Sequence, residues 1–383
     1  MSMRNRRRVL LVMMVVVTAG SAAAASVTLP TFQLLTRGIL DGGQFELGTQ
    51  ADVDIAFGGG YKFGGQLALS IASANLEQPT TLGPAYDPST LQAALDERLS
   101  LSSASVIVRD LFGAPIDLTY FIGEYDRFVN GDVFPDRFGT DPVGSFYRGL
   151  LYFPDSVSYD GTLLADGTGI AIALRGLTDW LYLDGAVYQD AYLGSGYYST
   201  DMRAAVNFQA FKAEAYVGAS FPQAPLGTYR AGLLLYYAPI PATHFLAEVG
   251  VPRFAPGSGE VFSLEDVLIR FEPRVYVGIV SLAVSILWHP EFYLNQPTGE
   301  GGESDMVVRL VAGNINENVI SGGVEGAAHL PSGFATENLE VVAAPFVTIA
   351  SSGVLWDFKV NFNVLPFSMS DLFEAYIGVR TEF

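Results

Sequence analysis

The chain has 383 residues, of which 50% are hydrophobic and 16% are charged, and it contains no cysteine. The high apolar and aromatic content excludes an intrinsically disordered chain, and the missing cysteines exclude a disulfide scaffold and a cysteine-based zinc site. Acidic residues outnumber basic residues 40 to 21, which gives a net charge of −19. We expect no nucleic-acid partner, because binding to phosphates requires clustered Lys and Arg.

Residues 1–25 have the three parts of a secretory signal peptide. A basic stretch with four arginines precedes the apolar run 9–17, and the small residues 23–25 offer a cleavage site. The apolar run is too short for a stable membrane-spanning helix, although a retained signal anchor is the alternative interpretation. We therefore expect residues 26–383 to be exported as one domain. Loss of the four arginines lowers the net charge from −19 to −23.

Apolar and polar residues alternate along most of the exported chain, which is the pattern of a β-strand with two different faces. In residues 45–57, for example, Phe45 and Val53 lie on one face, whereas Asp52 and Asp54 lie on the other. Strands of soluble proteins usually have about five or six residues, whereas tilted membrane-spanning strands need about 9–11. Several alternating runs here reach ten residues or more, so the pattern predicts transmembrane strands.

The alternating runs divide the chain into a long series of predicted strands. We place them near residues 45–57, 61–73, 101–110, 116–125, 168–175, 180–190, 201–210, 212–221, 228–238, 243–251, 264–272, 275–287, 305–312, 319–328, 338–349, 353–364 and 372–383, with a weaker candidate at 31–40. Residues 146–153 either form another strand or belong to a loop. Short joints mostly alternate with long ones, as in barrels with short periplasmic turns and long extracellular loops. We expect an all-β fold, a transmembrane antiparallel up-and-down β-barrel of about 16–18 strands, with 18 preferred because bacterial single-chain barrels are usually even.

The last predicted strand places apolar side chains at alternate positions, among them Phe373, Ile377, Val379 and the terminal Phe383. This series resembles the assembly signal of Gram-negative outer-membrane β-barrel proteins, from which Thr381 departs mildly, and no subfamily is identified. The resemblance implies that the barrel-assembly machinery recognises this strand and that periplasmic chaperones escort the chain. It also implies location in the outer membrane, in contact with the lipid bilayer and with lipopolysaccharide or an equivalent outer leaflet.

The polar faces of the predicted strands carry both signs of charge at close spacing, as expected for a water-filled lumen. We predict the following pore-lining residues: Asp52, Asp54, Lys62, Arg109, Asp117, Lys212, Glu214, Asp357, Lys359 and Arg380. Acids barely exceed bases on these faces. Most of the negative charge is therefore expected in the loops, notably 126–167 and 291–305.

Two loop segments contain clusters of carboxylates, which are candidate metal ligands. Residues 126–146 interleave four Asp with four Phe, but their spacing misses the calcium-binding EF-hand pattern, so we expect an acidic loop in solvent. Glu300, Glu303 and Asp305 are likewise expected to be solvated. We therefore predict no metal site and no cofactor.

Signatures of catalysis are close to absent. The histidines His244, His289 and His329 lie near loop edges, and nothing in the sequence places them beside a serine or a carboxylate. The chain lacks the G-x-S-x-G, P-loop, H-E-x-x-H and G-x-G-x-x-G motifs. We predict no catalytic residues and no enzymatic activity.

A barrel of about 16–18 strands encloses an aqueous channel rather than a filled core. We therefore predict a porin-like channel for passive diffusion of small hydrophilic solutes, with a mild preference for cations because the excess acid lies in the loops. One alternative is a selective transporter for a hydrophobic substrate, with residues 126–167 or the residues before Phe45 as a plug. Another is a surface adhesin or structural barrel. The sequence leaves open whether the chain forms a homo-oligomer.

Overall fold

The computed structural model describes residues 25–41, 44–59, 62–73, 98–141, 143–146, 161–193, 196–221, 227–256, 259, 261–293, 296–298, 301–313, 319–332, 339–367 and 372–382. Two predictions lie largely or wholly outside this part. The signal peptide overlaps it only at Ala25, and the terminal Phe383 follows it. Both stay predictions.

The main sheet contains eighteen strands. They are β1 (Ala25–Asp41), β2 (Gln44–Gly59), β3 (Phe63–Ser73), β4 (Arg98–Val108), β5 (Ile116–Phe128), β6 (Leu163–Thr178), β7 (Leu181–Asp190), β8 (Tyr198–Asn207), β9 (Phe211–Phe221), β10 (Thr228–Ile240), β11 (Thr243–Phe254), β12 (Leu268–Val277), β13 (Val280–Trp288), β16 (Ser304–Ala312), β17 (Ile320–Leu330), β18 (Glu340–Ser351), β19 (Val354–Leu365) and β20 (Phe373–Glu382). The short strands β14 (Phe292–Tyr293) and β15 (Gln296–Pro297) form a separate hairpin.

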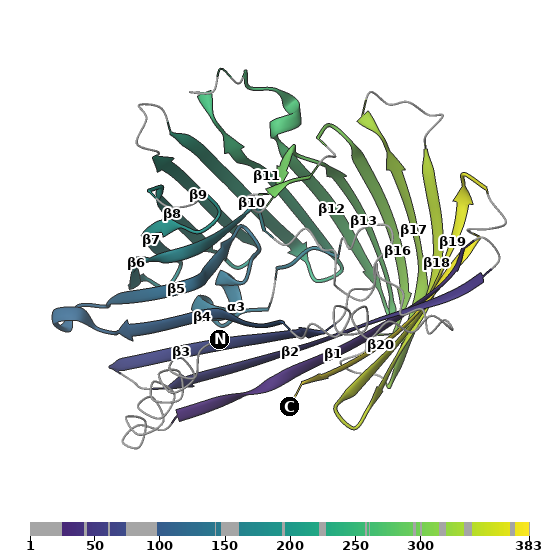
Figure 1. Ribbon diagram of the computed structural model, residues 1–383, viewed down its shortest axis with the longest axis horizontal. Helices are drawn as coiled ribbons and strands as arrows, with labels where there is room; N and C mark the ends of the chain where they lie inside the picture. The colour runs from purple at the N-terminus through teal and green to yellow at the C-terminus, as the bar shows by residue number, and fades with distance from the viewer. Residues whose placement is uncertain are drawn as a thin grey trace, which may run out of the picture.

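All pairings in the main sheet are antiparallel, and each strand pairs with its neighbours in the chain. The first strand, β1, also pairs with the last strand, β20, from Thr31 opposite Glu382 to Ile39 opposite Glu374. This pairing joins the two ends of the sheet (Figure 1). The predicted all-β, antiparallel up-and-down architecture is confirmed. Within the described residues, the main sheet has 18 strands, which is the preferred number.

The two faces of the strands differ in polarity as the alternation predicts. Apolar side chains on the outer face are exposed, such as Met202 (61%), Val217 (60%) and Ile377 (48%). Charged side chains such as Glu214 and Asp357 are fully buried on the inner face. An apolar outer band around a polar interior is the arrangement of transmembrane β-barrels.

One predicted boundary, between β12 and β13, is wrong. We expected a joint near residues 273–274, but the strands pair through Val277 and Val280, and the turn is Gly278–Ile279. Gly278 has φ +58°, a conformation that glycine adopts without steric strain. The apolar run across this turn hides the boundary, because hydrophobicity alone does not distinguish two short strands from one.

Residues 129–141 and 143–146, which follow β5, lie in the barrel interior (Figure 1). This stretch, here called the inward segment, contains the short helix α3 (Val133–Phe138). Phe134 is fully buried, whereas Asp132, Asp136 and Asp141 are exposed. The expectation of a loop in solvent is therefore correct for these three carboxylates. It is wrong for Phe134, because burial of an apolar side chain against the wall is favourable. In the part of the chain that the structure describes, no helix has the length and hydrophobicity required to cross a membrane.

The residues before Phe45 were the other predicted plug. Residues 25–41 instead form β1, which pairs with β2 and β20 over most of its length. Pairing on both sides satisfies the backbone hydrogen-bonding groups of this strand within the wall. This part of the plug prediction is wrong.

Candidate functional site

Glu214 on β9 anchors the beginning of the inward segment. Its carboxylate accepts hydrogen bonds from the backbone N–H groups of Val129 (2.7 Å) and Gly131 (3.1 Å). The guanidinium of Arg203 lies 3.5 Å from the same carboxylate. These partners satisfy a fully buried charge. Glu214 therefore lies on the inner face, as the alternation predicts, but underneath the inward segment.

Glu272 on β12 anchors the other end of the inward segment. Its carboxylate accepts hydrogen bonds from the Ser145 hydroxyl (2.7 Å) and the Phe146 backbone N–H (3.0 Å). The neighbouring Arg274 donates to the carbonyl of Gly144, and its guanidinium lies 4.1 Å from the centre of the Phe146 ring. The sequence analysis did not identify these anchors. The inward direction of Glu272 follows from the alternation, but no local signal relates it to a loop more than a hundred residues earlier.

A third contact joins the chain to the wall just before β6. Thr162, just before β6, donates its hydroxyl to Glu248 on β11 at 2.9 Å. Arg270 on β12 lies 3.4 Å from the same carboxylate. Three wall carboxylates, Glu214, Glu248 and Glu272, therefore bind the described residues at the two ends of the inward segment and just before β6.

The wall next to these anchors contains a network of buried ion pairs. Arg203 contacts Asp184 at 2.8 Å and Asp126 at 2.6 Å. Arg230 contacts Asp201 at 2.7 Å. Buried charges are tolerated when such pairing and hydrogen bonding offset their desolvation. The pairing neutralises much of the charge on this side of the inner wall.

Three of the predicted pore-lining residues form two ion pairs on the part of the wall that contains β17 to β20. Lys359 on β19 contacts Glu325 on β17 at 2.9 Å, and Arg380 on β20 contacts Asp357 on β19 at 3.1 Å. Asp357 also accepts a hydrogen bond from the Thr348 hydroxyl at 2.7 Å. These charges face inward, but their main contacts are with other residues of the wall.

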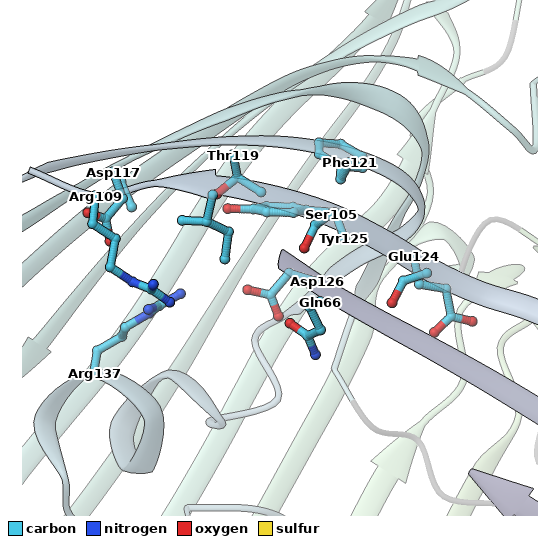
Figure 2. A pocket seen from close by; sticks show the side chains of 13 residues that line it. Gln66, Ser105, Arg109, Asp117, Thr119, Phe121, Glu124, Tyr125, Asp126 and Arg137 are labelled. Carbon is cyan, nitrogen blue, oxygen red and sulfur yellow. The ribbon is translucent and has the colours of Figure 1, made fainter. Parts of the chain in front are cut away.

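A pocket of about 140 Å³ separates α3 from the wall formed by β3 to β6 (Figure 2). Its lining is mostly polar and includes Gln66, Ser105, Arg109, Asp117, Thr119 and Arg137. The guanidinium groups of Arg109 and Arg137 point toward each other across this space in Figure 2. Asp117, also predicted to line the pore, pairs with Arg175 at 2.6 Å. This pocket is the candidate site for contact with a passing solute.

Arg137 connects the pocket to the tyrosines of the wall. Its guanidinium lies 5.2 Å from the centre of the Tyr182 ring. Burial lowers the pKa of Arg137, but Tyr182, Tyr125 and Asp126 raise it by more, so its pKa lies above the ordinary value. The α3 side of the pocket therefore presents a permanent cation beside several carboxylates.

The remaining predicted pore-lining residues are spread over the barrel. Lys62 is exposed at the turn before β3, and Lys212 on β9 donates to the Thr140 hydroxyl of the inward segment at 2.9 Å. Asp52 and Asp54 belong to β2, but their side chains lie outside the part that the structure describes. Apart from the side chains of Asp52 and Asp54, the structure thus gives the positions of the predicted residues, while their role in lining a pore stays a prediction.

The predicted assembly signal occupies the strand that joins both ends of the sheet. Phe373, Ile377 and Val379 lie on β20, which pairs with β19 and β1. Ile377 is exposed on the outer face. Recognition of this strand by the assembly machinery stays a prediction.

Two histidines that appeared isolated in the sequence lie beside one carboxylate. His289 Nε2 is 3.0 Å from Asp305 Oδ2, and His329 Nδ1 is 2.6 Å from Asp305 Oδ1. His329 Nε2 is also 3.0 Å from Glu303 Oε2. Nothing in the sequence indicated these contacts, and the expectation that Asp305 is solvated is wrong, because strand register makes Asp305 and His329 cross-strand neighbours. The third histidine, His244, instead bonds to the hydroxyl of Tyr236.

Comparison with known proteins identifies similar structures but no similar sequence. No family model matches the chain, and no curated protein matches it. OccAB2 of Acinetobacter baumannii superposes with a TM-score of 0.55 at 11% identity, covering 94% of this chain and 98% of that one. The outer membrane protein OpdK of Pseudomonas aeruginosa has a TM-score of 0.53 at 14% identity, with coverage of 92% and 98%.

OccK11 of Pseudomonas aeruginosa is similar to the same degree, with a TM-score of 0.53, 9% identity and coverage of 94% and 96%. OpdK is described as an outer membrane protein, and at 9–14% identity the likeness to these structures shows the fold alone. The resemblance to outer-membrane barrels and the predicted outer-membrane location are in agreement with them. The chain therefore shares the β-barrel fold of these three proteins.

Proposed function

We propose that the protein is a porin-like channel through which small hydrophilic solutes diffuse passively. The observation that carries this proposal is the pocket between α3 and the wall, whose lining is mostly polar. Hydroxyl, amide and charged groups there can replace part of the hydration shell of a polar solute. The inward segment narrows the interior on this side, which limits the size of the solute.

We further propose that the channel has a mild preference for cations. The inward segment carries the exposed carboxylates of Asp132, Asp136 and Asp141 against the single cation Arg137. Their effect on an ion extends over a screening length of about 10 Å at 0.1 M salt. Because salt ions screen these carboxylates, the preference for cations should increase as the salt concentration is lowered.

A selective transporter is the second candidate, and the inward segment is the observation that favours it. The inward segment is hydrogen-bonded to the wall at both ends, as the plug or constriction of a transporter would be. A hydrophobic substrate is disfavoured, however, because Phe134 is buried within the interior packing rather than exposed to a passage. A surface adhesin would need no passage at all.

Single-channel recording of refolded residues 26–383 in a planar bilayer tests these functions. We expect a non-saturating conductance and a cation-selective reversal potential in a potassium chloride gradient, with stronger selectivity at the lower of two ionic strengths. Saturating, substrate-dependent uptake would favour the transporter, and an insulating barrel would contradict the channel. Anion preference at low salt would contradict the cation proposal and would indicate that Arg109 and Arg137 dominate the constriction.

A further inference from the structure

Three side chains from neighbouring parts of the wall converge at the end of the barrel that carries the long loops. His289 follows β13, Asp305 lies on β16, and His329 lies on β17. Their possible ligand atoms all lie within 4.8 Å of one another. We propose that these three residues bind a divalent transition-metal ion such as Zn²⁺.

The backbone of the sheet holds the three residues in place. Asp305 pairs with His329 across β16 and β17 and with Leu287 across β16 and β13. His289 extends the second pairing, because its N–H donates to the Glu303 carbonyl at 2.9 Å. Ligands carried by rigid strands keep their mutual geometry with little loss of conformational entropy on binding.

The existing contacts have nearly the spacing that a metal requires. Zinc ligands lie about 2.0–2.1 Å from the ion, so tetrahedral neighbours are roughly 3.3 Å apart. The contacts of Asp305 with His289 (3.0 Å) and with His329 (2.6 Å) are shorter by less than 1 Å. A metal ion replaces the proton in each contact, and the ligand atoms separate slightly to admit it.

Glu303 adds the outer contact that metal-binding histidines commonly have. Its carboxylate lies 3.0 Å from His329 Nε2, while His329 Nδ1 faces Asp305. A ligating histidine usually donates its other ring N–H to a carboxylate or carbonyl, which fixes the tautomer and the ring orientation. Glu303 is therefore a positioning residue, and His329 Nδ1 is the ligand atom.

The types of ligand determine the class of metal. Two imidazoles and one carboxylate suit Zn²⁺, Ni²⁺ or Cu²⁺, whereas Ca²⁺ and Mg²⁺ prefer oxygen ligands. The side chains of His289 and Asp305 are only 3% and 5% exposed, so a bound cation would offset a buried carboxylate charge. His329 is 17% exposed, which gives water and ions access to the site. With three protein ligands, the fourth position remains for water.

Zinc titration of the refolded mature chain, followed by calorimetry, tests the proposal directly. We expect one Zn²⁺ per chain, without competition from excess Ca²⁺. His289→Ala and His329→Ala should each weaken binding at least about tenfold. His244→Ala is the matched control and should bind as the unmodified chain does, because His244 contacts Tyr236 instead. Equal zinc affinity in all four proteins would overturn the proposal.

A spectroscopic measurement distinguishes direct ligands from residues that only support the fold. Electron paramagnetic resonance of bound Cu²⁺ should show coupling to two imidazole nitrogens in the unmodified chain and to one in either His289→Ala or His329→Ala. Glu303→Gln should keep both couplings but bind about 10–100-fold more weakly. A copper spectrum without imidazole coupling in the unmodified chain would contradict the site.

Thermal unfolding serves as the check on folding in the same proteins. Zn²⁺ should raise the unfolding temperature of the unmodified chain and of His244→Ala, because an ion that binds only the folded state stabilises it. No such increase is expected for His289→Ala or His329→Ala, even where these variants fold normally without metal. An equal increase in the two site variants would contradict the assignment of the ligands.

Discussion

Two parts of the inner wall contain the same kinds of buried ions but have different partners. On β9 and β12, Glu214 and Glu272 accept hydrogen bonds from the inward segment. On β17 to β20, Glu325 and Asp357 pair with Lys359 and Arg380 of the wall itself. Both arrangements satisfy buried carboxylates. Only the first connects the wall to a segment that narrows the interior.

This difference shows that an inward-facing charge is not by itself a pore-lining charge. Glu214 and Lys359 were predicted from the same alternating pattern, and both are almost completely buried. Arg109 and Asp117, from the same prediction, instead contribute to the polar pocket beside α3. The neighbours of each side chain, rather than its face on the strand, decide its access to a solute.

The largest expected effect comes from removing one buried carboxylate from each of the two parts of the wall, Glu214 on β9 and Glu325 on β17. Glu214→Gln and Glu325→Gln should each destabilise the barrel by about 3–5 kcal/mol, because each leaves a buried cation with an incomplete set of partners. Only Glu214→Gln should also increase single-channel conductance, since it loosens the inward segment. Refolding titrations with urea and planar-bilayer recording measure the two effects. An equal increase in conductance in both variants would remove the distinction between the two sides.

A second comparison sets the outer face against the inner face. Ile377→Arg, near the middle of β20, should cost about 2–4 kcal/mol, because a charge there lies in lipid. Gln66→Arg should change stability little, since Gln66 is exposed in the polar pocket. Urea titrations in lipid vesicles measure both variants. Similar losses of stability would show that the register assigned to β20 or β3 is wrong.

The charges of the inward segment should have a smaller effect, on selectivity alone. A carboxylate about 10 Å from an ion contributes about 0.15 kcal/mol at 0.1 M salt after screening, so the triple change of Asp132, Asp136 and Asp141 to Asn should lower cation preference about twofold. Asp179→Asn, in the short turn after β6, is the control and should leave the reversal potential nearly unchanged. Equal shifts would mean that the inward segment has no special influence on the ion pathway.

An effect of similar small size, on stability, concerns the contact of α3 with the wall. Arg137→Gln removes the cation from above the Tyr182 ring and should destabilise the barrel by about 0.5–1 kcal/mol. Lys62→Gln is the matched change of an exposed cation at the β2–β3 turn and should have almost no effect. Thermal unfolding of both variants provides the comparison, and an equal response would show that the Tyr182 contact contributes nothing measurable.

The strands and their two faces could be predicted from the sequence because each depends on a local pattern. Alternation over ten or so residues predicts both the strand and the direction of its side chains. Even the weak candidate at 31–40 corresponds to a wall strand, β1. The exception is the β12–β13 turn, where an apolar run continues across Gly278 and Ile279. There the local pattern contains no boundary.

The tertiary structure alone decided the course of the inward segment and the grouping of the histidines. Glu214 and Val129 are 85 residues apart in the chain, and Glu272 and Phe146 are 126 apart. His329 reaches Asp305 only because β16 and β17 pair in one register. Hydrophobic alternation determines which way a side chain points from its strand. The residue that it meets depends on the pairing of all the strands around the barrel, which no local pattern contains.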